Sequence, residues 1–83
     1  MPYIKKEMRD ALQSGREDPQ TAGDLNYQIT ELIQDYALAK GLTYQVINDI
    51  IGALEGAKLE FYRRVAVPYE DKKIEDNGDV YVL

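Results

Sequence analysis

The chain has 83 residues, and its 15 acidic and 10 basic side chains give a formal net charge of −5. It contains no cysteine and no histidine, which excludes disulfides, thiol chemistry, imidazole catalysis and nearly every zinc or copper site. Apolar residues make up 45% of the sequence, which is enough for one small domain with a thin core.

The distribution of charge and of apolar residues argues against two kinds of partner. A nucleic-acid-binding protein normally has a basic face, but the largest basic cluster here is small and comprises Lys5, Lys6, Arg9 and Arg16. No run approaches the roughly 20 apolar residues that a membrane span needs, and the first residues do not resemble a signal peptide. We therefore expect a cytoplasmic protein that binds neither nucleic acid by charge nor a membrane.

The first predicted helix covers residues 3–14. Pro2 suits its first turn, and Gly15 can end it in the left-handed conformation. Its apolar face is narrow, which predicts a helix that packs on a surface supplied by other elements. That face comprises Ile4, Met8, Ala11 and Leu12.

The second predicted helix covers residues 24–40. Thr21 and Asp24 have the spacing of a capping box, with Asp in place of the usual Glu, and Gly41 ends the helix. Its apolar stripe comprises Leu25, Ile29, Leu32, Ile33 and Tyr36. Only Gly41 and Leu42 precede Thr43, the expected N-cap of the next helix, so the two helices should form an antiparallel αα-hairpin.

The third predicted helix covers residues 44–67 and should end at Val67, because Pro68 disfavours helical geometry in the residue before it. Its apolar residues follow helical spacing, with Leu54 expected at the centre of the core. They comprise Ile47, Ile50, Ile51, Leu54, Phe61, Tyr62 and Val65, interrupted by Lys58. At about 36 Å, against roughly 25 Å for the second helix, it should leave an overhang that needs a cover.

Two glycines interrupt this third helix, at a cost of about 1 kcal/mol each relative to Ala. Gly52 and Gly56 are four residues apart, a spacing that allows another backbone to approach closely. Two interpretations stay open. The glycines either pack against Ala37 and Ala39 of the second helix or form a crossing with a second copy of the chain.

The acidic C-terminal segment, residues 68–83, also has two interpretations. Asn77-Gly78 is a strong β-hairpin signal. The favoured alternative is a short helix over residues 69–76 with Gly78 near its C-cap, because Glu70 and Asp71 suit a helix N-terminus. In either case, we expect the segment to dock against the overhang of the third helix.

These elements predict an all-α fold. The expected architecture is one three-helix domain, residues 1–83, built on a long antiparallel αα-hairpin with a docked acidic C-terminal segment.

Several segments resemble a family of small hypothetical proteins from bacterial and phage or prophage genomes. The resemblance covers nearly the whole chain apart from residues 11–20. Its main segments are Met1-Pro2-Tyr3-Ile4-Lys5-Lys6, Gly23-Asp24-Leu25-Asn26-Tyr27, Lys58-Leu59-Glu60-Phe61-Tyr62-Arg63-Arg64, Pro68-Tyr69-Glu70-Asp71 and Asn77-Gly78-Asp79-Val80-Tyr81. Because that family has no assigned function, the resemblance implies a fold unit and a phage-like source but no activity.

The sequence does not indicate an enzyme. The acids and bases of the third helix have the spacing of solvated ion pairs, such as Glu60 with Arg64, worth about 0.2–0.5 kcal/mol each. The carboxylates match no calcium loop, and no glycine-rich phosphate loop is present. We therefore expect no catalytic residue, no cofactor and no metal.

The seven tyrosines favour a non-enzymatic protein-interaction module that self-associates, although Tyr also commonly completes the rim of a small core. The interface candidates are Gly52, Gly56, Phe61, Tyr62, Val65, Tyr69 and Tyr81. One alternative is an acidic inhibitor of a host nucleic-acid enzyme or defence protein. The other is a binder of small anionic ligands that uses Arg63 and Arg64.

Overall fold

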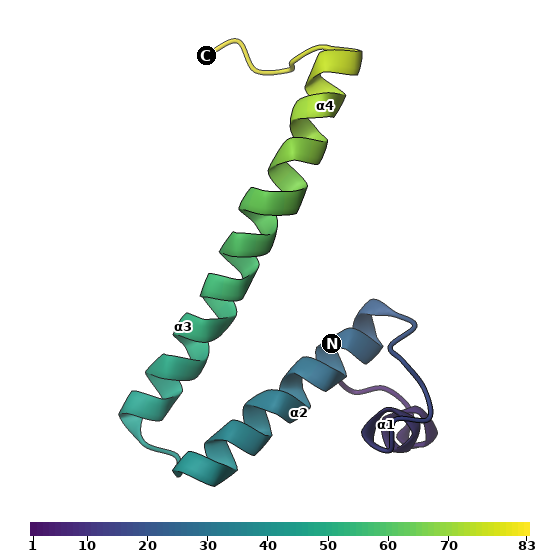
Figure 1. Cartoon of the computed structure of the whole chain (residues 1–83), viewed down its shortest axis with the longest axis vertical. Coiled ribbons are helices and arrows are strands. Elements are labelled where there is room, and N and C mark those ends of the chain that lie inside the picture. Colours follow the sequence, from purple (N-terminus) through teal and green to yellow (C-terminus); the bar gives the residue numbers. More distant parts are fainter. The chain divides into compact units, whose positions relative to one another are not determined.

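The computed structural model describes all 83 residues, and every regular element in it is a helix. The chain forms two compact units, Met1–Ile47 and Asn48–Leu83. The elements are α1 (Lys6–Gln13), α2 (Ala22–Lys40), α3 (Tyr44–Phe61), the π-helical turn η1 (Tyr62–Ala66) and α4 (Val67–Asn77). Because α3, η1 and α4 follow one another without a break (Figure 1), they make a single long third helix. The predicted all-α class with three helices is confirmed.

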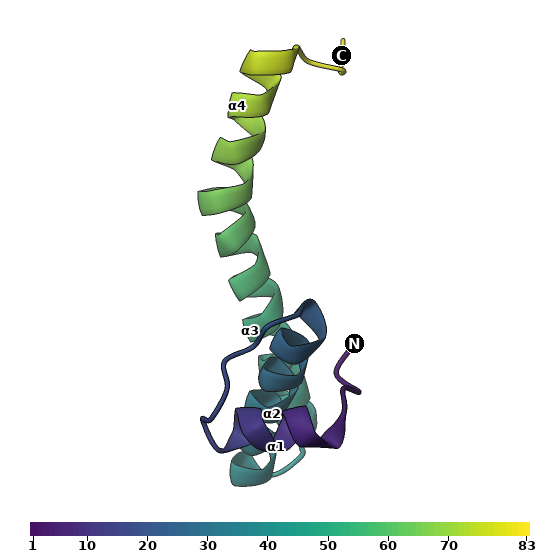
Figure 2. The same ribbon diagram turned by 90° about the vertical axis from the view of Figure 1, so that its right-hand side faces the viewer.

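In the first unit, α1 packs against α2 (Figures 1 and 2). The buried apolar side chains are Ala11 and Leu12 of α1 and Val46 at the start of α3. Gly23 allows a close approach that sequence reasoning missed, since a Cβ there would lie 3.2 Å from the Ile4 side chain and 3.3 Å from the Met1 carbonyl oxygen. The core of this unit is therefore thin, as expected for its size.

The first helix is shorter than predicted, because Lys5 is extended and the residues before it form a tight turn in which the Ile4 N–H donates to the Pro2 carbonyl. Pro2 therefore precedes the helix instead of opening it. Gly15 has a positive φ of 77°, as predicted for the residue that ends α1.

The predicted capping box at the start of α2 is present. The Thr21 hydroxyl accepts from the Asp24 N–H at 3.0 Å, and the Asp24 carboxylate accepts from the Gln20 N–H at 2.9 Å. With its shorter side chain, Asp24 thus pairs with the residue before the N-cap. These bonds compensate for the burial of Asp24, which is only 5% exposed. The helix begins at Ala22, two residues earlier than predicted.

The ends of α2 and α3 follow the predicted signals. Gly41 ends α2 with a φ of 87°. Thr43 caps α3, because its hydroxyl accepts from the Val46 N–H at 3.2 Å. Packing of α2 along α3 would join the two units, so the antiparallel αα-hairpin and the single domain stay predictions.

The prediction that the third helix ends at Val67 is wrong, because the chain remains helical to Asn77. Pro68 lacks an N–H, and in an α-helix its ring would meet the carbonyl four residues earlier. The π turn η1 precedes it, and the Val67 N–H donates to the Tyr62 carbonyl, five residues back. This wider turn accommodates Pro68 near the start of α4.

The favoured prediction for the C-terminal segment is a short helix closed near Gly78. The segment is indeed helical, and Gly78 is its C-cap. The Gly78 N–H donates to the Ile74 carbonyl at 2.8 Å, and the φ angle of Gly78 is 90°. The β-hairpin alternative is wrong, because residues 79–83 contain no strand. Among these residues, the Tyr81 N–H donates to the Asp79 carboxylate at 2.8 Å.

The expected docking of residues 68–83 against the end of the third helix is also not observed. Val82 is 96% exposed, and Val80 and Tyr81 are exposed as well. The reason is chain length. Since α4 continues the helix, Gly78 lies about 20 Å along the axis from Val65, whereas the five residues after it reach about 17 Å when extended.

Replacing Pro68 tests whether it causes the π turn. Pro68→Ala restores an N–H and removes the ring, so we expect η1 to become α-helical. The free energy of unfolding should rise by up to about 3 kcal/mol, the cost of an interior proline. Thermal melts by circular dichroism and backbone chemical shifts of residues 61–69 measure both effects. Lys72→Ala, at an exposed position of α4, is the control. An unchanged melt with the π turn retained would show that Pro68 does not cause it.

Candidate functional site

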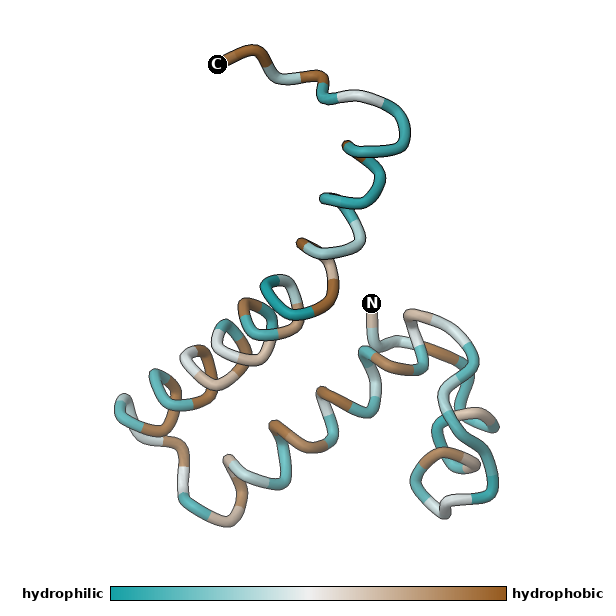
Figure 3. The backbone as a smooth tube through the Cα atoms, turned by 45° about the horizontal axis from the view of Figure 1, so that its top comes forward, coloured by the Kyte–Doolittle hydropathy of each residue, from teal (hydrophilic) through white to brown (hydrophobic).

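Apolar side chains line one side of the long helix in the second unit. We call Ile51, Leu54, Lys58, Phe61, Tyr62 and Val65 the apolar stripe, with Lys58 as its one charged member. At 100° per residue these positions fall within an arc of about 100°. Hydrophobic colour recurs along α3 and gives way to mostly hydrophilic colour in α4 (Figure 3).

The stripe has no cover in its own unit. Its apolar members range from 40% exposed at Leu54 to 65% at Phe61. The prediction that Leu54 is central to the core is therefore wrong for the isolated chain, because the unit has no second helix to bury it. A helix face of this kind is suited to packing against another helix.

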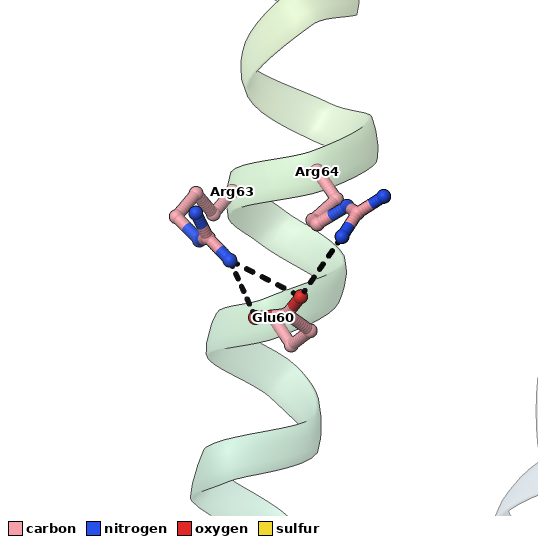
Figure 4. A network of polar contacts seen from close by, with 3 residues as sticks. All are labelled: Glu60, Arg63 and Arg64. Carbon is pink, nitrogen blue, oxygen red and sulfur yellow. Dashed lines mark hydrogen bonds and ion pairs between the residues drawn. The ribbon is translucent and has the colours of Figure 1, made fainter.

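Charged side chains gather around Glu60 on the same helix (Figure 4). Arg63 donates from one nitrogen to both Glu60 carboxylate oxygens, at 3.1 and 2.9 Å, and Arg64 lies 3.6 Å from the same carboxylate. Glu60 is nine residues from Ile51, which places it about 180° around the helix from that residue, whereas Arg64 lies only about 60° from Phe61 and therefore borders the stripe. All three side chains are exposed, so these ion pairs add little stability.

This network bears on the predicted anion-binding residues. Arg63 and Arg64 lie together, as the prediction requires, but Glu60 already pairs with both guanidinium groups. A small anion would have to compete with that carboxylate. The anion site stays a prediction, and the geometry does not favour it.

The interface candidates fall on different parts of the second unit. Phe61, Tyr62 and Val65 share the stripe. Gly52 lies nine residues before Phe61, about 180° away, and Gly56 is close to it on that opposite face. A Cβ built on either glycine would meet no atom within 4 Å, so neither serves a close approach within its own unit.

Two further interface candidates lie beyond η1. The additional residue in that turn sets the side chains after it back by about 100°. Tyr69 is therefore out of line with Ile51, although a straight helix would align the two. Tyr81 belongs to the exposed C-terminal residues. The stripe thus ends at the π turn.

A second polar arrangement joins α1 to α2, and sequence reasoning missed it. The Tyr27 hydroxyl and the Gln13 side-chain amide both donate to the same oxygen of the Glu31 carboxylate. They border an open pocket of about 280 Å³, lined by Leu12, Gln13, Tyr27, Gln28, Glu31, Leu32 and Asp35. The spacing of Tyr27 and Glu31 is visible in the sequence, but the contribution of Gln13 depends on how α1 crosses α2.

The hydrogen bond to Glu31 raises the pKa of Tyr27, and burial and the charge of that carboxylate act in the same direction. Arg9 lowers the pKa by a smaller amount. A tyrosine with a raised pKa stays protonated near neutral pH, so it serves as a hydrogen-bond donor and not as a base. The cluster therefore supports a structural role.

The structure lacks two other features that would indicate a function. No group of three or more His, Cys, Asp or Glu residues is arranged to hold a metal ion. No helix combines the length and the apolar character that crossing a membrane requires.

The structure thus belongs to the class of small all-helical proteins with an exposed apolar helix face. A family model described as "Domain of unknown function (DUF6899)" matches residues 1–80, and the chain belongs to this family. The comparisons with curated proteins and with solved structures found no match. The expected membership in an uncharacterised family is confirmed.

The Tyr27 cluster predicts a specific pH dependence. The folded pKa lies above the ordinary value of about 10, so the Tyr27–Glu31 bond stabilises the fold fully below that pH and its contribution is lost as pH rises through the folded pKa. Subtracting the tyrosinate absorbance titration of Tyr27→Phe from that of the wild type isolates Tyr27 among the seven tyrosines.

In the Glu31→Gln variant, we expect the pKa of Tyr27 to fall toward its ordinary value, because the negatively charged acceptor is gone. If Tyr27 titrates identically in the wild type and in Glu31→Gln, the proposed cause of the shift is wrong.

Proposed function

We propose that this chain is a non-enzymatic protein-interaction module that self-associates through the apolar stripe. The observation that carries the proposal is the exposure of Leu54, Phe61 and Val65 on one face of a helix that has no second helix in its own unit. Contiguous exposed apolar surface is typical of interaction sites. The resemblance to proteins of bacterial and phage genomes extends the proposal to a phage- or prophage-like source.

The length of the helix supports the need for a partner. Its three parts contain 18, 5 and 11 residues, which gives about 50 Å, whereas α2 with 19 residues spans about 28 Å. Wherever α2 lies, it is too short to cover the whole of the longer helix. Most helices in proteins depend on tertiary packing of an apolar face for their stability. A second copy of the chain would supply that packing.

The acidic C-terminal region supports one alternative. Exposed carboxylates of α4 and the residues after it outnumber the two lysines there, and they comprise Glu70, Asp71, Glu75, Asp76 and Asp79. Such a surface fits an acidic inhibitor of a host nucleic-acid enzyme or defence protein. The anionic-ligand alternative has less support, because Glu60 pairs with Arg63 and Arg64.

Two variants on opposite faces of the helix test self-association. We expect the wild type to exceed monomer mass by light scattering at high micromolar concentration. Phe61→Asp should shift the mass to the monomer, because an unpaired charge in an apolar contact is strongly unfavourable. Gly56→Leu, on the opposite face, should leave the mass unchanged. Circular dichroism of both variants checks that helix content is retained.

The outcomes separate the two predicted contacts. Dissociation by Gly56→Leu but not by Phe61→Asp would move the interface to the glycine face. A wild-type protein that remains monomeric at high concentration would end the proposal.

A further inference from the structure

The apolar stripe has the spacing of a coiled-coil seam. Its members Ile51, Leu54, Lys58, Phe61 and Val65 are separated by alternating steps of three and four residues. In a heptad with positions labelled a to g, Ile51, Lys58 and Val65 thus occupy position "a", and Leu54 and Phe61 occupy position "d". The repeat ends at Val65, within η1, because the turn from Tyr62 to Ala66 changes the direction of the side chains after it.

From this pattern we propose that two copies of the second unit pair through the stripe as antiparallel helices, with Lys58 of each copy against Phe61 of the other. The proposal rests on the self-association proposed above and specifies its geometry. Lys58 decides the direction, because it is the only charged residue in the seam.

A parallel pair in register would place the two Lys58 side chains opposite each other at the same a layer. Two ammonium groups at one layer repel, and a polar residue at an a position lowers the stability of the pairing. Within each chain Lys58 lies 3.6 Å from Glu55, an exposed contact that offsets little of this repulsion. The parallel arrangement is therefore disfavoured.

In an antiparallel pair, residues at position "a" face residues at position "d", so the two Lys58 side chains are separated. Centring the pair between Leu59 and Glu60 places Lys58 against Phe61 and Leu54 against Val65. Two-fold symmetry repeats both layers. The Lys58 stem can then pack along the apolar surface while its ammonium group lies over the Phe61 ring, a favourable cation–π arrangement.

Charges beside the seam select this register over its neighbours. In the proposed register, Glu55 of one copy faces Tyr62 of the other, whose hydroxyl can donate to the carboxylate. Sliding the pair by one heptad in one direction would bring the two Glu55 side chains together. Sliding it in the other direction would bring the two Arg64 side chains together. Both alternatives place like charges side by side, which is unfavourable.

The stripe also leaves room beside the partner. Ile50 flanks one edge of the arc and Tyr62 the other, so the apolar surface spans about 120° of the helix. That is wider than the seam of a two-stranded coiled coil. A further helix could pack along one edge while the second copy occupies the centre.

Distances between spin labels in the dimer test the direction of pairing. Because the chain has no cysteine, each single substitution introduces one label per copy. The variants are Asn48→Cys, Leu59→Cys and Glu75→Cys. For the antiparallel pair, labels at residue 59 should lie close together, whereas labels at 48 and 75 should be separated by about 35 and 46 Å along the axis.

A parallel pair would instead give short distances at all three positions, set by the roughly 8–10 Å between helix axes and the length of the labels. That result would overturn the inference while leaving self-association in place. No dipolar coupling at any position would indicate a monomer and overturn both proposals. Adding Phe61→Asp to the Leu59→Cys variant should abolish the short distance. Its persistence would show that the stripe is not the contact and would also overturn the inference.

Discussion

A single helix cannot cover its own apolar side chains, and this constraint governs the second unit of the chain. From Asn48 to Asn77, that unit consists of one helical path followed by a few exposed residues. Side chains from Ile51 to Val65 therefore have no cover within the unit, however favourable their helix propensity is. The first unit avoids the problem in part, because α1 packs on α2 and buries Ala11 and Leu12. The proposed self-association rests on this difference between the units.

Pro68 and the π turn determine how far the stripe extends. A proline at this position would ordinarily end the helix, which would leave the acidic residues after it free to fold back. The π turn lets the helix continue, so the acidic residues of α4 are carried away from the stripe along the axis. The same turn interrupts the heptad spacing after Val65. One backbone irregularity thus separates an apolar segment, suited to pairing, from a charged one that remains in water.

The sequence predicted the ends of the helices, through local signals, better than it predicted how the helices pack. The Thr21–Asp24 box, the Thr43 cap and the glycines at 15, 41 and 78 act through neighbouring backbone groups, and the structure places each of them as a cap or a helix end. The rule for Pro68 failed because it assumes α-helical geometry, whereas the chain changes the geometry of the preceding turn.

Contacts between elements were less predictable. Periodicity identified the stripe to which Leu54 belongs, but it cannot tell whether an apolar face is buried within the chain or left for a partner. The Tyr27–Glu31–Gln13 cluster depends on the crossing of α1 over α2, which the spacing of residues does not encode. The candidate surface was therefore predictable as a list of residues, and the spacing of Gly52 and Phe61 already separates them on a helix. Only the structure shows that no atom lies within 4 Å of a Cβ built on Gly52.

Pairing through the stripe would couple association to folding. The first unit buries few apolar side chains, and the second unit buries none of its large ones fully. If an antiparallel partner supplies the missing packing, a large share of the folding free energy arises only when two copies meet. The apparent stability then rises with protein concentration, since a partner that binds only the folded state shifts the folding equilibrium by mass action. In such a system Lys58 contributes less to stability than an apolar residue would, but it disfavours the parallel arrangement. The lower stability would be offset by specificity, because pairing in one direction would give the longest helix of the chain a single defined set of neighbours.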